Sequence, residues 1–167
     1  GAKEMSSTGK TKCILIDPPS MEVNISGEEG VKEAKEEIAS SPPIGLAYIA
    51  ALLRENGIEV SVIPSLGQTF TKYLSINLIA GERPDLVRVT VFASQLRTAL
   101  QMCQQIREAC PTTKIVVGGP HIHPLHNEVI KKGFIDFCVR GEGEFTMLEL
   151  VGAISHGLET KGVRGLT

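Results

Sequence analysis

The sequence predicts an α/β fold, a Rossmann-like, flavodoxin-like doubly wound domain built on a five-stranded parallel sheet. Two observations lead to this prediction. Five short apolar runs alternate with helical segments along the chain, which is the order of elements in a βαβ protein. No hairpin signal separates any two runs, so the strands are expected to be parallel with right-handed crossovers. The expected strand order is 2-1-3-4-5.

Each expected strand is a short apolar run bounded by turn residues. The first run, 12–17, is followed by Pro18-Pro19, and the fourth by Gly118-Gly119-Pro120. Continuous apolar runs of this length are typical of strands that are buried on both faces. The five strands are expected at 12–17, 58–63, 86–92, 114–117 and 134–139.

The helices are predicted from periodicity and from start and stop signals. Leu46, Ile49 and Leu53 share one stripe of a helix that Asn56-Gly57 ends. Ser94 is a candidate N-cap for a later helix. We expect helices at about 44–57, 69–81, 94–110, 127–132 and 141–156. The acidic segment 21–41 is expected to be a mobile loop, and residues 161–167 carry no periodicity.

Length and composition exclude several classes of protein. The chain has 167 residues, 42% hydrophobic and 22% charged, which suits one globular domain. A net charge of −2 does not suggest a nucleic-acid partner, and no apolar run is long enough for a membrane span. The 4 cysteines form neither a C-x-x-C pair nor a three-cysteine cluster, which predicts a reduced, cytoplasmic protein with no metal site.

Three familiar nucleotide or phosphate motifs fail on their context. Gly9-Lys10-Thr11 resembles the end of a P-loop but precedes the first strand. Gly141-Glu-Gly-Glu-Phe-Thr146 opens a helix after the last strand, so no ribose-binding acid follows on another strand. A phospho-acceptor receiver domain needs an acid after its third strand, where this chain has Val91-Phe-Ala-Ser94.

Three histidines follow the expected fourth strand. His121, His123 and His126 have a spacing at which imidazoles can hold zinc or nickel. Pro120 and Pro124 interrupt this loop, and no acid or cysteine completes a ligand set nearby in the sequence. A polar loop at the ligand edge is the favoured interpretation, and the alternatives are one histidine that touches a bound ligand and a metal site.

The fold itself indicates where a ligand binds. In doubly wound sheets, ligands bind at the carboxyl ends of the strands, near the point where the strand order reverses. Four loops meet at this edge: 17–20, 93–96, 118–123 and 140–144. The glycines at 118 and 119 permit close approach of a ligand or of neighbouring backbone.

The motifs in these loops resemble the cobalamin-binding domains. Ser94-Gln95-Leu96 and Gly118-Gly119 match the serine-x-leucine and glycine-pair motifs that follow strands three and four in that group. The sequence is more similar still to the N-terminal cobalamin (B12)-binding domain of B12-dependent radical-SAM enzymes, from about residue 12 to 156. The segments that carry this similarity are DPP at 17–19, PPIGLAYIA at 42–50, GGPH at 118–121 and VRGEGE at 139–144.

The resemblance implies a bound cobalamin whose nucleotide tail is displaced into the protein. Cobalamin-binding domains have a histidine ligand after strand one, and here a proline stands in its place. The resemblance therefore implies no histidine lower ligand, a tail slot left open by the glycine pair, a serine donor to the tail base and apolar residues around it. The cofactor-binding residues expected are Asp17, Pro18, Pro19, Val91, Ser94, Leu96, Gly118, Gly119, Pro120, His121, Gly141, Glu142 and Gly143. Replacement of Gly119 by leucine is expected to fill the slot and leave stability largely intact.

The resemblance also implies a division of labour along a longer parent chain. We expect a disordered tail or expression remnant at 1–11, a cobalamin-binding-domain type fold at 12–157, and at 158–167 a linker towards a radical-SAM barrel. A [4Fe–4S] cluster and S-adenosylmethionine are expected only in that barrel, with no catalytic residue in this segment. The expected function is a cobalamin-binding module of a methyltransferase or oxidative cyclase. A docking domain without cofactor and a flavodoxin-like small-molecule sensor remain alternatives.

Overall fold

The structure, a computed structural model, describes residues 9–18, 44–63, 72–141 and 143–167. Within these residues it contains five strands and five α-helices, with two short 3₁₀ turns. The expected loop at 21–41 lies outside the described residues. The elements in chain order are β1 (Lys12–Ile16), α2 (Ile44–Glu55), β2 (Glu59–Ile63), α3 (Lys72–Glu82), β3 (Leu86–Thr90), η1 (Ala93–Gln95), α4 (Leu96–Ala109), β4 (Lys114–Gly118), η2 (His123–Leu125), α5 (His126–Ile130), β5 (Phe137–Val139) and α6 (Gly143–Ser155).

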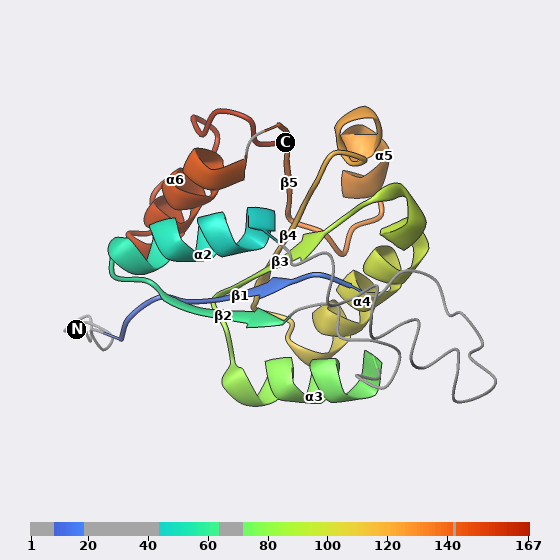
Figure 1. The fold of residues 1–167 in the computed structure, drawn as a ribbon, viewed down its shortest axis with the longest axis horizontal. Coiled ribbons are helices and arrows are strands. Elements are labelled where there is room, and N and C mark those ends of the chain that lie inside the picture. Colours follow the sequence, from blue (N-terminus) through green and yellow to red (C-terminus); the bar gives the residue numbers. More distant parts are fainter. Residues whose placement is uncertain (1–8, 19–43, 64–71, 142) are drawn as a thin grey trace, which may run out of the picture.

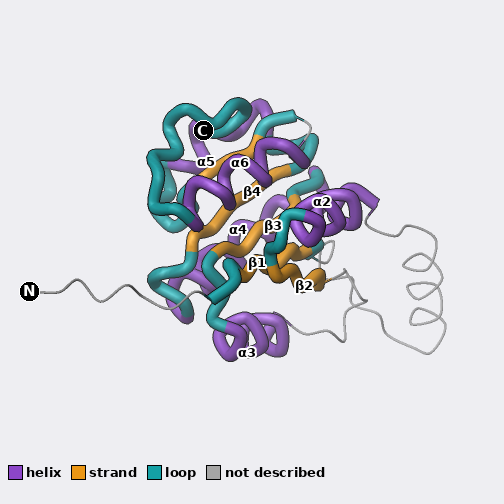
Figure 2. The backbone as a smooth tube through the Cα atoms, turned by 90° about the vertical axis from the view of Figure 1, so that its left-hand side faces the viewer, coloured by secondary structure: helices purple, strands orange, loops and turns teal. Residues whose placement is uncertain are grey.

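The sheet has the predicted topology. Its five strands are all parallel and lie in the order β2-β1-β3-β4-β5. Helices α2 and α6 lie on one side of the sheet, and α3 and α4 lie on the other (Figure 1). Figure 2 shows the strands as a twisted layer between these helices. The prediction of a doubly wound, flavodoxin-like α/β fold is confirmed.

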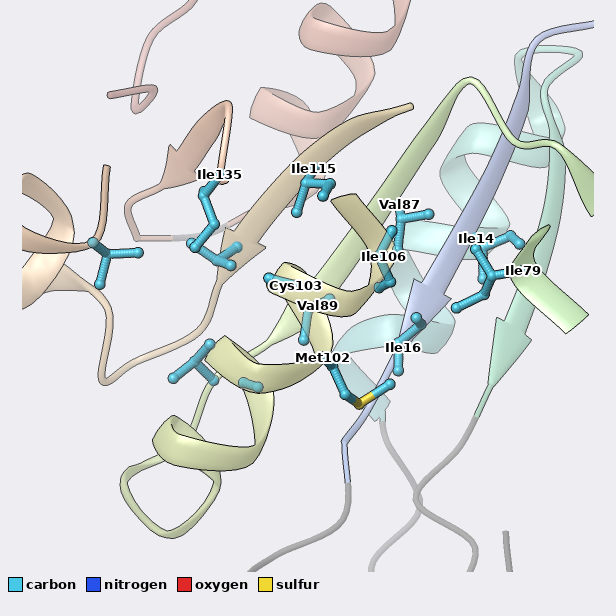
Figure 3. Close-up of a cluster of buried hydrophobic side chains, with 14 of the residues drawn as sticks. Ile14, Ile16, Ile79, Val87, Val89, Met102, Cys103, Ile106, Ile115 and Ile135 are labelled. Atoms are coloured by element: carbon cyan, nitrogen blue, oxygen red, sulfur yellow. The ribbon is translucent and has the colours of Figure 1, made fainter. Parts of the chain in front are cut away.

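Two apolar cores sit on the two faces of the sheet. Alternate side chains of β1 and β3 point to opposite faces, so Leu15 packs with α2 and α6 while Ile14 and Ile16 pack with α3 and α4. Figure 3 shows the second cluster, in which Val87 and Val89 of β3 meet Met102 and Ile106 of α4. Because β1 and β3 are covered on both faces, nearly every residue in them is buried.

Several element boundaries differ from the predictions. Ser94 does not cap α4, because it lies inside η1 and is exposed; Gln95 is the residue before α4 and makes no side-chain cap bond there. β5 begins at Phe137, because Phe134 and Ile135 pack into the core before the strand pairs with β4. The expected start of the helix at 69–71 lies outside the described residues.

The last residues of the chain pair with β5. Leu166 forms an antiparallel bridge with Val139, and Cys138 exchanges two backbone hydrogen bonds with Thr167, at 2.8 and 2.9 Å. Figure 1 places the C-terminal end beside β5. The sequence of this segment shows no strand periodicity, because its pairing with β5 is an isolated bridge and not a full strand. The assignment of 158–167 to a linker stays a prediction.

No helix among the described residues has the length and apolarity that crossing a membrane requires.

Candidate functional site

A cavity of about 590 Å³ lies at the carboxyl edge of the sheet, on the side that α2 and α6 cover. Cavities of about 300–1,000 Å³ are typical of small-molecule sites. It lies where the loops after β1, β3 and β4 meet the first turns of α2 and α6, close to the reversal of strand order. Its lining residues are Asp17, Ile44, Gly45, Leu46, Ile49, Arg88, Thr90, Phe92, Gly119, Pro120, His123, Gly141, Gly143 and Glu144.

Five of the expected cofactor-binding residues line this cavity: Asp17, Gly119, Pro120, Gly141 and Gly143. They come from three of the four loops that the fold prediction singled out. The structure therefore brings together residues that are more than 120 positions apart in the sequence, as the parallel topology requires.

The other expected residues lie elsewhere. Val91 is fully buried in the core between the sheet and α4, on the opposite face from the cavity. Leu96 packs beside that same core. Ser94 is exposed, and His121 is half-buried outside the cavity lining. Pro19 and Glu142 lie outside the described residues.

Gln95 joins the loop after β3 to the loop after β1. Its side-chain nitrogen donates to Asp17 Oδ1 at 2.9 Å and to the Pro18 carbonyl at 2.6 Å. Its side-chain oxygen accepts from the Phe92 N–H at 3.2 Å. Gln95 is only 5% exposed, and a buried amide with all these partners holds both loops in register. In the serine-x-leucine motif Gln95 is the variable position, so the motif does not predict this role.

Asp17 directly follows β1, and its carboxyl is half-buried. Burial raises its pKa above the ordinary value of 3.8, and the hydrogen bond from Gln95 partly opposes that shift. Its backbone N–H donates to Ile63 at 3.0 Å, which fixes the position of the loop. The Asp17 carboxyl thus lines the cavity, and the hydrogen bond from Gln95 fixes its orientation.

The glycine pair after β4 has two separate structural roles. A Cβ at Gly118 would lie 2.5 Å from Nη2 of Arg88, so this glycine makes room for that side chain. Gly119 has φ +130°, and its Cβ would lie 2.5 Å from the Val91 carbonyl. The expectation that leucine at 119 leaves stability largely intact is therefore wrong, because the side chain would collide with the protein's own backbone before it reached a ligand.

Arg88 is a buried cation in the middle of the central strand. It is 5% exposed, and its Nη1 donates to Thr90 Oγ1 at 3.0 Å. Its Nε has no hydrogen-bond partner among the described residues. Burial lowers its pKa to about 10, with Glu144 acting in the opposite direction. Arg88 therefore remains protonated at neutral pH and lines the cavity.

The histidine loop contributes one side chain to the cavity, that of His123. The rings of His123 and His126 have centroids 6.4 Å apart and are tilted by 52°. Within the described residues, no three histidine, cysteine, aspartate or glutamate side chains are grouped as a metal site would need.

The sequence reasoning missed Arg88, Thr90 and Phe92 as lining residues. Every residue of β3 is buried, so the strand lacks the alternation of polar and apolar residues that would mark Arg88 as facing a site. One signal was available: a charged residue within an otherwise apolar strand is rare in a core and marks a paired or functional group.

Comparison with known proteins supports a family assignment. Residues 39–151 match the family model described as the B12 binding domain. An uncharacterised methyltransferase of Pyrococcus horikoshii is 32% identical over 93% of this chain and 32% of its own length. An anaerobic magnesium-protoporphyrin IX monomethyl ester cyclase of Rubrivivax gelatinosus is 32% identical over 72% of this chain and 22% of its own length. The chain spans a third or less of these relatives.

Solved structures share the fold. The radical S-adenosylmethionine methyltransferase TsrM from Kitasatospora setae superposes with a TM-score of 0.74 and 23% identity, over 94% of this chain and 28% of that protein. The cobalamin-dependent S-adenosylmethionine radical enzyme OxsB has a TM-score of 0.73 and 16% identity, over 94% of this chain and 20% of that protein. Because the family model covers most of the described fold and its cavity edge, the chain belongs to the B12-binding domain family.

Proposed function

We propose that this chain is the cobalamin-binding module of a cobalamin-dependent radical-SAM enzyme of the methyltransferase or oxidative cyclase type. The observation that carries the proposal is the cavity of about 590 Å³ at the carboxyl edge, in a chain that belongs to the B12-binding domain family. The relatives include a methyltransferase and cyclases, which supports both reaction types for the parent enzyme.

The cavity suits the nucleotide tail of cobalamin, which combines an aromatic base with a ribose and a phosphate. Leu46 and Ile49 provide an apolar wall, while Asp17 and Thr90 provide polar groups for the sugar. Gly119 contributes its backbone to the lining of the cavity. When bound, cobalamin supplies a cobalt centre that carries a methyl group or exchanges an electron.

The described residues would bind and orient the cofactor. Gln95 holds the loops after β1 and β3 at a fixed separation, so that the tail slot is formed before the cofactor arrives. Pro19 stands where the aspartate-x-histidine-x-x-glycine motif has its histidine. A proline side chain has no atom that can coordinate cobalt, and the proposal therefore keeps the lower face free of a protein ligand from the β1 loop. His123 is the imidazole that lines the cavity among the described residues.

The remaining chemistry belongs to a longer parent chain. The relatives extend well beyond the segment that this chain matches, and we place the [4Fe–4S] cluster, S-adenosylmethionine and the catalytic groups in a barrel there. The four cysteines of this chain are free thiols, all buried, which suits a reducing cytoplasmic setting.

A titration with hydroxocobalamin tests the proposal. We expect the visible spectrum to shift and to saturate near one equivalent of protein, with the corrinoid retained on gel filtration. No shift and no retention would overturn the proposal. Affinity for the separately produced barrel in the absence of cobalamin binding would favour the docking domain, and a co-purified flavin or nucleotide would favour the sensor.

Electron paramagnetic resonance tests the lower ligand. After reduction of the bound cofactor to cob(II)alamin, we expect no superhyperfine splitting from an axial nitrogen. A splitting that persists in wild type and disappears in His123→Ala would identify a histidine ligand and contradict this part of the proposal.

A further inference from the structure

The cation of Arg88 forms no ion pair with a carboxylate of the described residues, although Glu144 at the same cavity acts to raise its pKa. Arg88 lies in the central strand β3 with apolar residues on either side, and no carboxylate among the described residues lies within 4.0 Å of it. A buried charge without a paired partner is costly. A methionine or leucine at position 88 would pack there without the free-energy cost of burying a charge. The presence of arginine therefore points to a ligand.

Within the described part of the chain, one N–H of the guanidinium, that on Nε, lacks a hydrogen-bond partner. Nη1 is engaged by Thr90, whereas Nε, which shares the other edge with Nη2, has no partner among the described residues. Two adjacent N–H donors on one edge form the fork that binds two oxygens of a phosphate or carboxylate.

Two glycines lie beside the Nε–Nη2 edge of the guanidinium. A Cβ on Gly118 would lie 2.5 Å from Nη2, and a Cβ on Gly143 would lie 3.4 Å from the same atom. Gly143 is the first residue of α6, a helix of 13 residues, whose first N–H groups lack acceptors within the helix. The cation and the positive end of the helix dipole therefore face the same part of the cavity.

We propose that Arg88, together with the N-terminus of α6, binds the phosphate of the cobalamin nucleotide tail. This inference rests on the proposed function and adds the group that recognises the tail. The half-buried carboxyls of Glu144 and Asp17 also line the cavity, and Glu144 acts to raise the pKa of Arg88. A single phosphate could accept hydrogen bonds from both the Arg88 guanidinium and the first N–H groups of α6.

Three corrinoids separate the phosphate from the rest of the cofactor. Cobalamin carries phosphate, ribose and base; cobinamide phosphate keeps the phosphate alone; cobinamide lacks the whole tail. We expect wild type to bind the two phosphate-bearing corrinoids more tightly than cobinamide. In Arg88→Met, affinity for those two should fall by about ten- to a hundredfold, as for a lost charge-assisted hydrogen bond. Affinity for cobinamide should be unchanged.

Two further variants sharpen the test. Arg88→Lys keeps the charge but not the fork, so its affinity for cobinamide phosphate should be intermediate. Arg83→Met removes an exposed arginine at the opposite edge of the sheet and should alter none of the three affinities. Thermal unfolding without cofactor supplies a second readout: Arg88→Met should be at least as stable as wild type, because an unpaired buried charge is removed.

The outcomes distinguish the two proposals. If wild type binds no cobalamin, the proposed function fails. If wild type binds cobalamin and Arg88→Met loses affinity for all three corrinoids equally, or for none, the phosphate assignment is wrong and the function stands. Loss of stability in apo Arg88→Met, with unchanged corrinoid preference, would make Arg88 a structural residue.

Discussion

At the scale of single residues, three polar side chains at the cavity edge hold the site together, of which Gln95 and Arg88 are buried and Asp17 is half-buried. Gln95 forms hydrogen bonds with the loop after β1 and with the loop after β3, and Asp17 accepts one of them. The Nε of Arg88 has no partner among the described residues. Buried polar groups are normally fully paired. Among the described residues, Gln105, His126 and Arg140 also have a buried atom without a partner, but Arg88 is the one of these four that lines the cavity.

The pKa of Asp17 leads to a prediction about pH. Because burial raises its folded-state pKa above 3.8, the folded state binds its proton more tightly than the unfolded chain. Stability is therefore lost as pH rises from about the ordinary value through the raised one. Asp17→Asn keeps the oxygen that accepts from Gln95 and removes this titration.

Thermal unfolding of both proteins between pH 3.5 and pH 7 measures the effect, with the pH range set by the ordinary carboxyl pKa of about 3.9. The melting temperature of Asp17→Asn relative to wild type should rise with pH and then level off. Glu149→Gln, which removes an exposed acid on α6, is the matched control and should show no such trend. A constant difference between Asp17→Asn and wild type would contradict the assignment.

At the scale of elements, the C-terminal segment completes the edge of the sheet. Gly165 accepts from the Arg140 N–H at 2.7 Å, and Thr146 of α6 donates to the Arg164 carbonyl at 2.9 Å. The two bonds between Cys138 and Thr167 pair backbone groups of β5 that would otherwise form an open edge, and the Arg140 bond continues this pairing just after the strand. The segment thus ties β5 to the start of α6, next to the cavity.

Gly165 offers a direct test of this arrangement. It has φ +78°, and a Cβ there would lie 2.9 Å from Thr146 Oγ1 and 3.2 Å from the Arg140 carbonyl. Gly165→Ala should therefore destabilise the domain by about 1–3 kcal/mol, as measured by urea unfolding. Gly162→Ala, where nothing lies within 4 Å, should change stability by less than about 0.5 kcal/mol. Equal effects of the two variants would show that the segment is not anchored as described.

At the scale of the whole molecule, the two cores enclose the cysteines. Burial raises the pKa of Cys13 and Cys103 to about 12 and that of Cys138 to about 11. Thiolates, not thiols, react with alkylating agents, so the folded domain should protect these three residues. Their labelling then reports on opening of the cores on either side of the sheet.

Alkylation with iodoacetamide at about pH 8, near the ordinary thiol pKa of about 8.5, tests this, with labelled sites identified by mass spectrometry. Cys13, Cys103 and Cys138 should remain unlabelled under native conditions and react fully in urea. In Gly165→Ala, Cys138 should become labelled before Cys13, because its strand loses the partner segment. Native labelling of Cys13 or Cys103 would contradict the packing described here.

The sequence predicted the elements better than it predicted the site. Apolar runs and breakers are local, so the five strands and their order followed from them. Ser94 shows the limit: a serine before a helical run is a typical N-cap, yet here a 3₁₀ turn intervenes and the side chain is exposed. Val91 shows another, because strand position alone does not reveal which face of a doubly covered sheet a side chain meets.

By itself, the sequence determined the doubly wound fold, the edge of the sheet at which the loops converge and the family resemblance. Tertiary structure decided which side chains reach the cavity. The role of Gln95 depends on hydrogen-bond partners in the loop after β1, which is distant in the chain. The role of Arg88 depends on an Nε that has no partner among the described residues. Local periodicity carries burial and element type, whereas the pairing of buried polar groups exists only once the loops are brought together.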